Sequence, residues 1–259
     1  MTEHRAPRLH ISAHLASGGE IALEPGQAHY LRSVLRRGPG TPVAVFNRED
    51  GEWRCRIAEI GKGGARLTVE HQVREPEAEP EADLWLLFAP IKRGRIDWLV
   101  EKATELGVSA LVPVWTARSQ VQRLNLDRLR AHAIEAAEQS ERLSVPELRP
   151  PETLERVIAG WPSARRLIIC DESGSGEPIA DAAARLMRGP TALLIGPEGG
   201  FDDAELDAIG KLSFVTRVGL GPRVLRAETA AVAALAVVQA IAGDWRRIRT
   251  VDRTCRRVD

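Results

Sequence analysis

The hydrophobic and polar positions change their spacing once along the chain, near residue 75. Before that point, short runs rich in β-branched and aromatic residues cover residues 43–46, 53–60 and 66–73. Turn signals of glycine, proline and aspartate separate these runs. This spacing predicts a small β-barrel over residues 1–74.

One segment of this first region shows helical spacing. In residues 29–38, HYLRSVLRRG, the apolar residues share one face, and Arg32 and Arg36 share another. The pattern predicts a short helix that presents two arginines to phosphate.

Residues 75–83 read EPEAEPEAD and contain no apolar side chain larger than alanine, which predicts a solvated, extended linker. After the linker, strand and helix patterns alternate, which indicates an α/β domain with a mostly parallel sheet over residues 84–245. The expected strands are residues 84–89, 110–114, 166–170, 191–195 and 214–218. The expected helices are residues 95–106, 127–140, 179–187, 203–209 and 228–241.

Composition narrows the class of protein. The 259 residues allow one large or two modest domains, and 44% hydrophobic with 28% charged residues is typical of soluble globular proteins.

The longest apolar run, residues 230–238, is far shorter than the roughly 20 residues that a membrane-spanning helix needs. Residues 1–10 show no secretory signal, so the expected compartment is the cytoplasm. Cys55, Cys170 and Cys255 are too far apart for a CxxC site, and we expect no metal.

The net charge gives no support to a nucleic-acid partner, because 36 basic residues balance 36 acidic ones. Arginines nevertheless gather in three patches, each of which taken alone is more simply a solvated surface. The patches are Arg32, Arg36 and Arg37; Arg118, Arg123, Arg128 and Arg130; and residues 246–257. Only their combination favours contact with RNA.

The segment GPEGGF, residues 196–201, follows a buried-type strand and precedes a helix with Asp202 as its N-cap and Glu205 closing a capping box. Its glycines remove Cβ atoms, so that backbone groups can approach a flat heterocycle closely. The segment matches neither GxxxxGK[ST] nor GxGxxG, which disfavours nucleoside triphosphates and NAD. A glycine-rich turn alone is also a common structural device.

A second loop of similar character, residues 219–229, follows another expected strand and opens an apolar helix. The two loops can form two walls of one pocket. Arg226 and Glu228 lie at the helix start, where anions are favoured. Arg226 is equally well explained by an ion pair with Glu228 or Glu198, and the residues alone do not decide between these roles.

The motifs LLIGPEGGF and LGPRVLRAETA closely resemble those of the RsmE family, the uridine N3-methyltransferases of bacterial small-subunit ribosomal RNA in the SPOUT superfamily. The resemblance extends in order over most of the chain. It includes HYLRSVLR, Lys92 with DWLVEKATELGV, Arg118-Ser119, and Glu138-Gln139 through Arg142 to Pro146.

The resemblance implies a PUA-like β-barrel that contacts RNA, a SPOUT-type α/β domain tied in a deep trefoil knot, and a homodimer. A general rule of topology would have rejected the knot. The resemblance also implies that S-adenosylmethionine is the cofactor. It assigns to cofactor binding Leu194, Ile195, Gly196, Pro197, Glu198, Gly199, Gly200, Leu220, Gly221, Pro222, Val224, Leu225 and Thr229.

The implied reaction is methylation of uracil N3 in 16S ribosomal RNA, at uridine 1498 in the family's usual RNA numbering, with Arg226 and Glu228 as catalytic residues. The expected substrate is an assembled or nearly assembled small subunit, and the general base is left open. The expected RNA-binding residues are Arg32, Arg36, Lys92, Arg118, Arg123, Gln139 and Arg142. The alternatives are a SPOUT enzyme for another RNA site or for ribose 2′-OH, and a non-catalytic RNA-binding protein. Residues 246–259 form a basic tail outside the family pattern.

Overall fold

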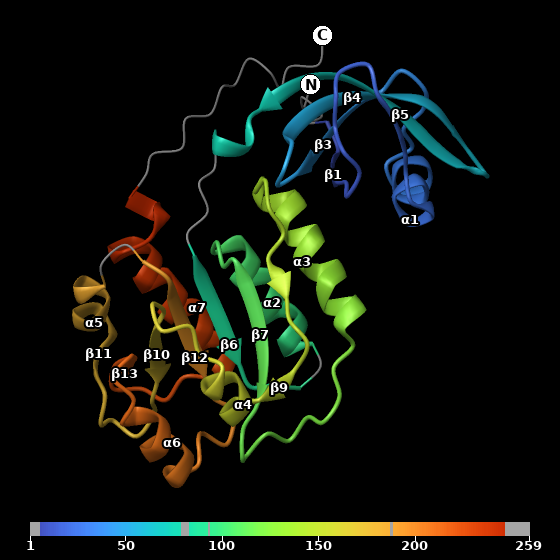
Figure 1. Cartoon of the computed structure of the whole chain (residues 1–259). Helices are drawn as coiled ribbons and strands as arrows, with labels where there is room; N and C mark the ends of the chain where they lie inside the picture. Colours follow the sequence, from blue (N-terminus) through green and yellow to red (C-terminus); the bar gives the residue numbers. More distant parts are fainter. Residues whose placement is uncertain (1–5, 79–82, 93, 187–188, 247–259) are drawn as a thin grey trace. The chain divides into compact units, whose positions relative to one another are not determined.

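A computed structural model describes residues 6–78, 83–92, 94–186 and 189–246 (Figure 1). The described residues divide into two compact units, one of residues 6–78 and 137–145, the other of residues 83–136 and 146–246. The division falls inside the expected linker. The return of residues 137–145 to the first unit was not expected. The basic tail after Arg246, Cys255 and the end of the helix expected at 179–187 lie outside the described residues.

The first unit contains a five-stranded sheet in the order β1-β3-β4-β5-β2. The bounds are β1 (Arg8–His10), β2 (Glu20–Ala22), β3 (Pro42–Asn47), β4 (Gly51–Gly61) and β5 (Gly64–Arg74). Strands β3, β4 and β5 pair antiparallel and enclose a core that includes Val43, Val45 and Leu67. The three long strands agree with the sequence pattern. Strands β1 and β2 have three residues each, too few to show a period.

The helix expected at residues 29–38 begins and ends four residues earlier. It begins with α1 (Pro25–His29), continues as a π-helical turn η1 (Tyr30–Val34), and ends before Arg36, whose φ is +54°. The start is set by Pro25 at the first helical position and by a capping box between Glu24 and Gln27. The expectation that Arg32 and Arg36 share a helical face was therefore wrong. The Arg32 Nη1 atom donates to the Gly61 carbonyl at 2.6 Å.

Arg8 holds residues 137–145 in the first unit. Its guanidinium donates to the Ala137 carbonyl at 2.9 Å and to the Arg142 carbonyl, and lies 3.5 Å from the centre of the Phe46 ring. Carbonyls at a helix end lack partners within the helix, so an arginine that reaches several of them stabilises the end. The Glu138 Oε1 atom in turn accepts from the His10 N–H at 2.9 Å.

The second unit is a parallel sheet in the order β11-β13-β10-β12-β6-β7-β8, and β9 pairs with β7 (Figure 1). The strands are β6 (Leu84–Phe88), β7 (Ala110–Trp115), β8 (Glu147–Leu148), β9 (Glu152–Thr153), β10 (Arg166–Cys170), β11 (Glu177–Pro178), β12 (Thr191–Ile195) and β13 (Val215–Gly219). All recorded pairs are parallel, as expected. Three short strands, β8, β9 and β11, were not predicted.

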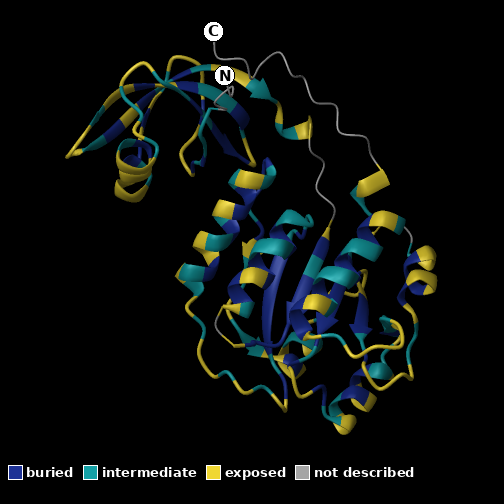
Figure 2. Ribbon diagram, turned by 180° about the vertical axis from the view of Figure 1, so that it is seen from behind, coloured by how far each residue is buried: buried dark blue, intermediate teal, exposed yellow. Residues whose placement is uncertain are grey.

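Helices cover both faces of this sheet. They are α2 (Arg95–Glu105), α3 (Leu126–Ser140), α4 (Leu154–Ala159), α5 (Ile179–Arg185), α6 (Asp203–Gly210) and α7 (Ala227–Ile241), followed by a 3₁₀ turn η3 (Asp244–Arg246). Leu87, Ala192 and Leu194 alternate along their strands into a core with α4 and α6, while α2, α5 and α7 pack together. All five residues of β12 are buried, which explains its uninterrupted apolar run (Figure 2). Of the helices described, none combines the length and hydropathy needed to cross a membrane.

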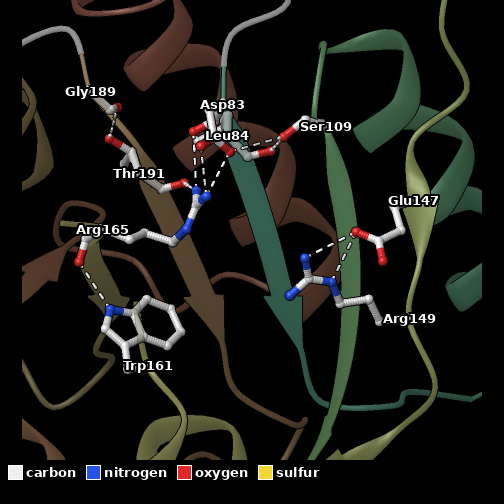
Figure 3. Close-up of polar contacts among 9 residues, drawn as sticks. All are labelled: Asp83, Leu84, Ser109, Glu147, Arg149, Trp161, Arg165, Gly189 and Thr191. Carbon is white, nitrogen blue, oxygen red and sulfur yellow. Dashed lines mark hydrogen bonds and ion pairs between the residues drawn. The ribbon is translucent and has the colours of Figure 1, made fainter. Parts of the chain in front are cut away.

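The strand arrangement at the amino edge of the sheet depends on Arg165 (Figure 3). Its Nη2 atom donates to both Asp83 carboxylate oxygens at 2.7 Å, and its Nη1 atom donates to the Thr191 carbonyl at 3.1 Å. The guanidinium also lies 3.5 Å from the centre of the Trp85 ring. Burial lowers the pKa of Arg165, and the ion pair with Asp83 opposes that shift. One buried cation thus joins the starts of β6, β10 and β12.

Replacement of this cation tests its contribution. We expect Arg165→Met to lower the free energy of unfolding by about 2 kcal/mol, less than for a fully buried pair because water reaches Asp83. The control is Arg149→Met, which removes a cation from the same Trp85 ring but from an exposed pair with Glu147, and should cost below about 1 kcal/mol. Urea unfolding followed by circular dichroism measures both. Equal losses would show that the Asp83 contact adds nothing.

Candidate functional site

Both glycine-rich loops lie at the carboxyl edge of the parallel sheet. Strand β12 ends at Ile195, and its loop lies between those that follow β10 and β6. Strand β13 ends at Gly219, on the far side of β10. In open α/β sheets, ligands bind at this edge. The structure therefore places the loops of residues 196–201 and 219–229 on one side of the sheet, as two walls of a single site require.

Close contacts fix the loop after β12. A Cβ atom on Gly196 would lie 2.9 Å from the Phe201 ring, which is only 9% exposed. Gly200 has φ +68°, and a Cβ atom there would lie 2.0 Å from the Glu172 carboxylate. These two positions require glycine, whereas Gly199 has only a 4.0 Å neighbour and no unusual φ. Gly196 and Gly200 thus fix the conformation of the loop, and Gly199 is the glycine with space beside it.

The start of helix α6 anchors the other end of this loop. Asp202 is its N-cap, as expected, and accepts from the Ala204 N–H at 3.1 Å. Glu205 reaches across to accept from the Ala117 N–H at 3.2 Å, which joins α6 to the loop after β7. Burial raises the pKa of Glu205, and the backbone N–H groups of Ala117 and Asp202 oppose that shift.

Arg118, which we expected on RNA, contacts the glycine loop directly. Its Nη1 atom donates to the Gly199 carbonyl at 3.3 Å, and its Nη2 atom lies 3.5 Å from Asp202. The side chain is 46% exposed, so it still presents charge to solvent. Lys92 and Arg123 are also exposed, in the segments after β6 and β7. The structure therefore brings Lys92 and Arg118 to the same edge as the loops.

Arg95, at the first position of α2, is a charged residue at this edge that the sequence analysis did not single out. Its Nη1 atom lies 3.4 Å from the Glu198 Oε1 atom, and its Nε atom lies 3.6 Å from the Glu228 Oε1 atom. Glu228 is 9% exposed, and its Oε2 atom is buried without a hydrogen-bond partner. Arg95 thus takes the ion-pair role that we had considered for Arg226.

Arg226 itself is the exposed N-cap of α7, and it makes no ion pair with any residue that the structure describes. Gly221, at φ +96°, has open space around it, and Val224 is 80% exposed. Leu225 is half-buried and Thr229 is exposed. The second loop therefore offers free backbone and a free guanidinium beside the buried Glu228.

The remaining expected RNA-binding residues belong to the first unit. Arg32 is partly buried, while Arg36 and Gln139 are exposed. Arg142 is only 6% exposed and donates to the Ser144 hydroxyl at 3.1 Å, so its side chain offers little surface to a partner.

In the second arginine patch, Arg128 pairs with Asp97 and Arg130 pairs with Asp127. The Arg130 pair is solvated, whereas the Arg128 pair joins α3 to the buried Asp97 of α2.

Two family models match the chain. Residues 78–239 match an RNA methyltransferase domain, and residues 23–70 match an RNA methyltransferase PUA domain. The chain is 31% identical over 234 residues to ribosomal RNA small subunit methyltransferase E of Rickettsia conorii, covering 90% of this chain and 94% of the relative. The chain belongs to the RsmE family of RNA methyltransferases. The family inferred from the two loops and their accompanying motifs is confirmed.

Solved structures of two methyltransferases share the fold. The methyltransferase E from Neisseria gonorrhoeae, bound to S-adenosyl methionine, has a TM-score of 0.82 at 26% identity, and the match covers 93% of this chain and 99% of that one. A methyltransferase from Legionella pneumophila, in complex with the same cofactor, has a TM-score of 0.81 at 30% identity, and the match covers 92% and 98%. The α/β class with a PUA-type first unit is thus confirmed. The knot depends on how loops thread, which strand order does not define, and it stays a prediction.

A methyl group added to Gly196 tests the shape of the first RsmE loop. We expect Gly196→Ala to cost about 2 kcal/mol of stability, because the Phe201 ring is packed in the core and cannot yield easily. Gly199→Ala, three residues away with ordinary van der Waals space, is the control and should change stability by less than about 0.5 kcal/mol. Thermal unfolding measures both. The double variant Gly196→Ala/Phe201→Leu should regain part of the loss, and a failure to do so would contradict the proposed clash.

Proposed function

We propose that this chain transfers a methyl group from S-adenosylmethionine to N3 of a uridine in small-subunit ribosomal RNA. The observation that carries the proposal is the meeting of two RsmE-type glycine loops at the carboxyl edge of one parallel sheet. The names of the Rickettsia and Bacillus subtilis relatives support the RNA substrate. The cofactor in the Neisseria and Legionella structures supports the methyl donor.

The described residues fit this cofactor. The open space at Gly199 and Gly221 lets backbone groups approach a flat ring. We assign the grip to residues 194–200 of the first loop and to Leu220, Gly221, Pro222, Val224, Leu225 and Thr229 of the second. When bound, the cofactor supplies an electrophilic methyl group on a sulfonium sulfur.

Uracil N3 carries a proton in the neutral base and must lose it before it can accept the methyl group. Arg226 has a free guanidinium, which stabilises the negative charge that develops on the uracil oxygens. Glu228 has a free carboxylate oxygen, which accepts the N3 proton as the new N–C bond forms and the S–C bond breaks. Arg95 leaves Arg226 available for this task by pairing with Glu228 itself.

We assign RNA contact in the second unit to Lys92, Arg118 and Arg123, and in the first unit to Arg32, Arg36 and Gln139. Each is an exposed or half-exposed polar side chain that can meet a phosphate or base edge. The RsmE relationship also leads us to propose a homodimer and a trefoil knot in the second unit, with an assembled or nearly assembled small subunit as the substrate.

Arg226→Ala tests the catalytic assignment. We expect the variant to bind S-adenosylmethionine with unchanged Kd in calorimetry, but to methylate small-subunit RNA about 100-fold more slowly, because it lacks the group that stabilises the uracil anion. Arg166→Ala is the control, since this exposed arginine lies at the amino edge of β10, opposite the site. A variant with normal binding and full activity would remove Arg226 from the mechanism.

The substrate itself is tested by deleting the protein from its host. We expect mass-spectrometric mapping of small-subunit RNA to show loss of N3-methyluridine at one position, uridine 1498 in the usual RNA numbering, and its return on complementation. Loss of a ribose 2′-O-methyl group, or of a methyl group elsewhere, would support the alternative SPOUT activities. No change in RNA methylation, together with no cofactor binding, would support a non-catalytic RNA-binding protein.

A further inference from the structure

Arg95 occupies a position where a cation is electrostatically unfavourable. It is the first residue of α2, and the amino end of a helix carries a partial positive charge. A cation at such a position requires compensation from nearby anions. Two carboxylates, Glu198 and Glu228, provide it at 3.4 Å and 3.6 Å.

These two carboxylates come from the two different ligand loops. Glu198 belongs to the loop after β12, and Glu228 belongs to the first turn of α7, which follows the loop after β13. The side chains of Glu198 and Glu228 are 26% and 12% exposed, whereas that of Arg95 is 40% exposed, so water reaches the cation of both pairs. In the described part of the chain, Arg95 is the side chain that pairs with acids from both loops.

The two ends of Glu228 have different surroundings. Its Oε1 atom faces Arg95, whereas its Oε2 atom is buried with no hydrogen-bond partner. A carboxylate held at one oxygen has a fixed direction for the other, and an unpaired buried oxygen is costly unless a ligand pairs with it. The arrangement is therefore complete only when a ligand is bound.

We propose that Arg95 is a positioning residue that joins the two cofactor loops through Glu198 and directs the Glu228 Oε2 atom toward the reacting base. This inference rests on the proposed function. Through Glu198, Arg95 fixes the shape of the loop that grips the cofactor. Through Glu228, it fixes the acceptor of the uracil proton.

The test measures cofactor Kd by calorimetry and the single-turnover rate of methyl transfer at saturating cofactor. We expect Arg95→Ala to raise Kd about tenfold and to lower the rate about tenfold, with an unchanged melting temperature in the absence of cofactor, because ion pairs at a partly exposed site add little stability. Arg95→Lys keeps one charge but cannot fork to both acids, and should recover about threefold in each quantity.

Arg156→Ala is the matched control, because Arg156 also lies in the first turn of a helix and pairs with an acid, Glu152, at 3.2 Å. It should change neither quantity.

An Arg95→Ala protein with wild-type Kd and rate overturns the inference and leaves the proposed function intact. A lower melting temperature without cofactor, with no recovery by lysine, also overturns it by showing a purely structural role. A wild-type protein that does not bind S-adenosylmethionine overturns the proposed function as well as this inference.

Discussion

The parallel pairing of β12 between β10 and β6 is the constraint on which the site depends. Because every recorded pair in this sheet is parallel, every strand delivers its following loop to the same edge. Because β12 is fully buried, the position at which its following loop begins is fixed. The packing of Phe201 against Gly196 then fixes the backbone conformation of the loop. The chemistry at the edge follows from this backbone arrangement, since Arg118, Glu172, Glu198 and Arg95 reach it from four different loops.

Much of the second unit was predictable because its elements have strong periods. The bounds of β10 and β12 agree with the apolar runs. Gly107, whose φ is +85°, follows the end of α2, as the sequence predicted. The short strands β8, β9 and β11 were missed, because two residues cannot show a period. In the first unit, the predicted helix began too late. Pro25 and the capping box between Glu24 and Gln27 start the helix, whereas the prediction used the apolar spacing of the residues that follow.

The site was predictable only in part, because local motifs can be found in a sequence, whereas contacts between residues far apart in the chain cannot. A glycine loop after a strand is a local signal, and both loops were found in this way. Contacts of long charged side chains need not be local, since Arg95 is 103 residues from its partner Glu198 and Arg8 is 129 residues from Ala137, whose carbonyl accepts its hydrogen bond. No spacing rule connects such positions. One signal did exist for Arg95, because an arginine in the first turn of a helix opposes the helix dipole and so requires acids nearby.

Arginines that stabilise the fold differ in burial and pairing from an arginine that is available to a ligand. Arg165 and Arg8 are nearly buried, and their donors are taken by carboxylates and carbonyls of their own unit. Arg226 is exposed and has no ion pair in the described chain, although Glu228 lies two residues away. The Glu228 Oε1 atom lies 3.6 Å from the Arg95 Nε atom instead. The contacts of Arg95 therefore join the two glycine-rich loops and leave Arg226 outside that group of ion pairs.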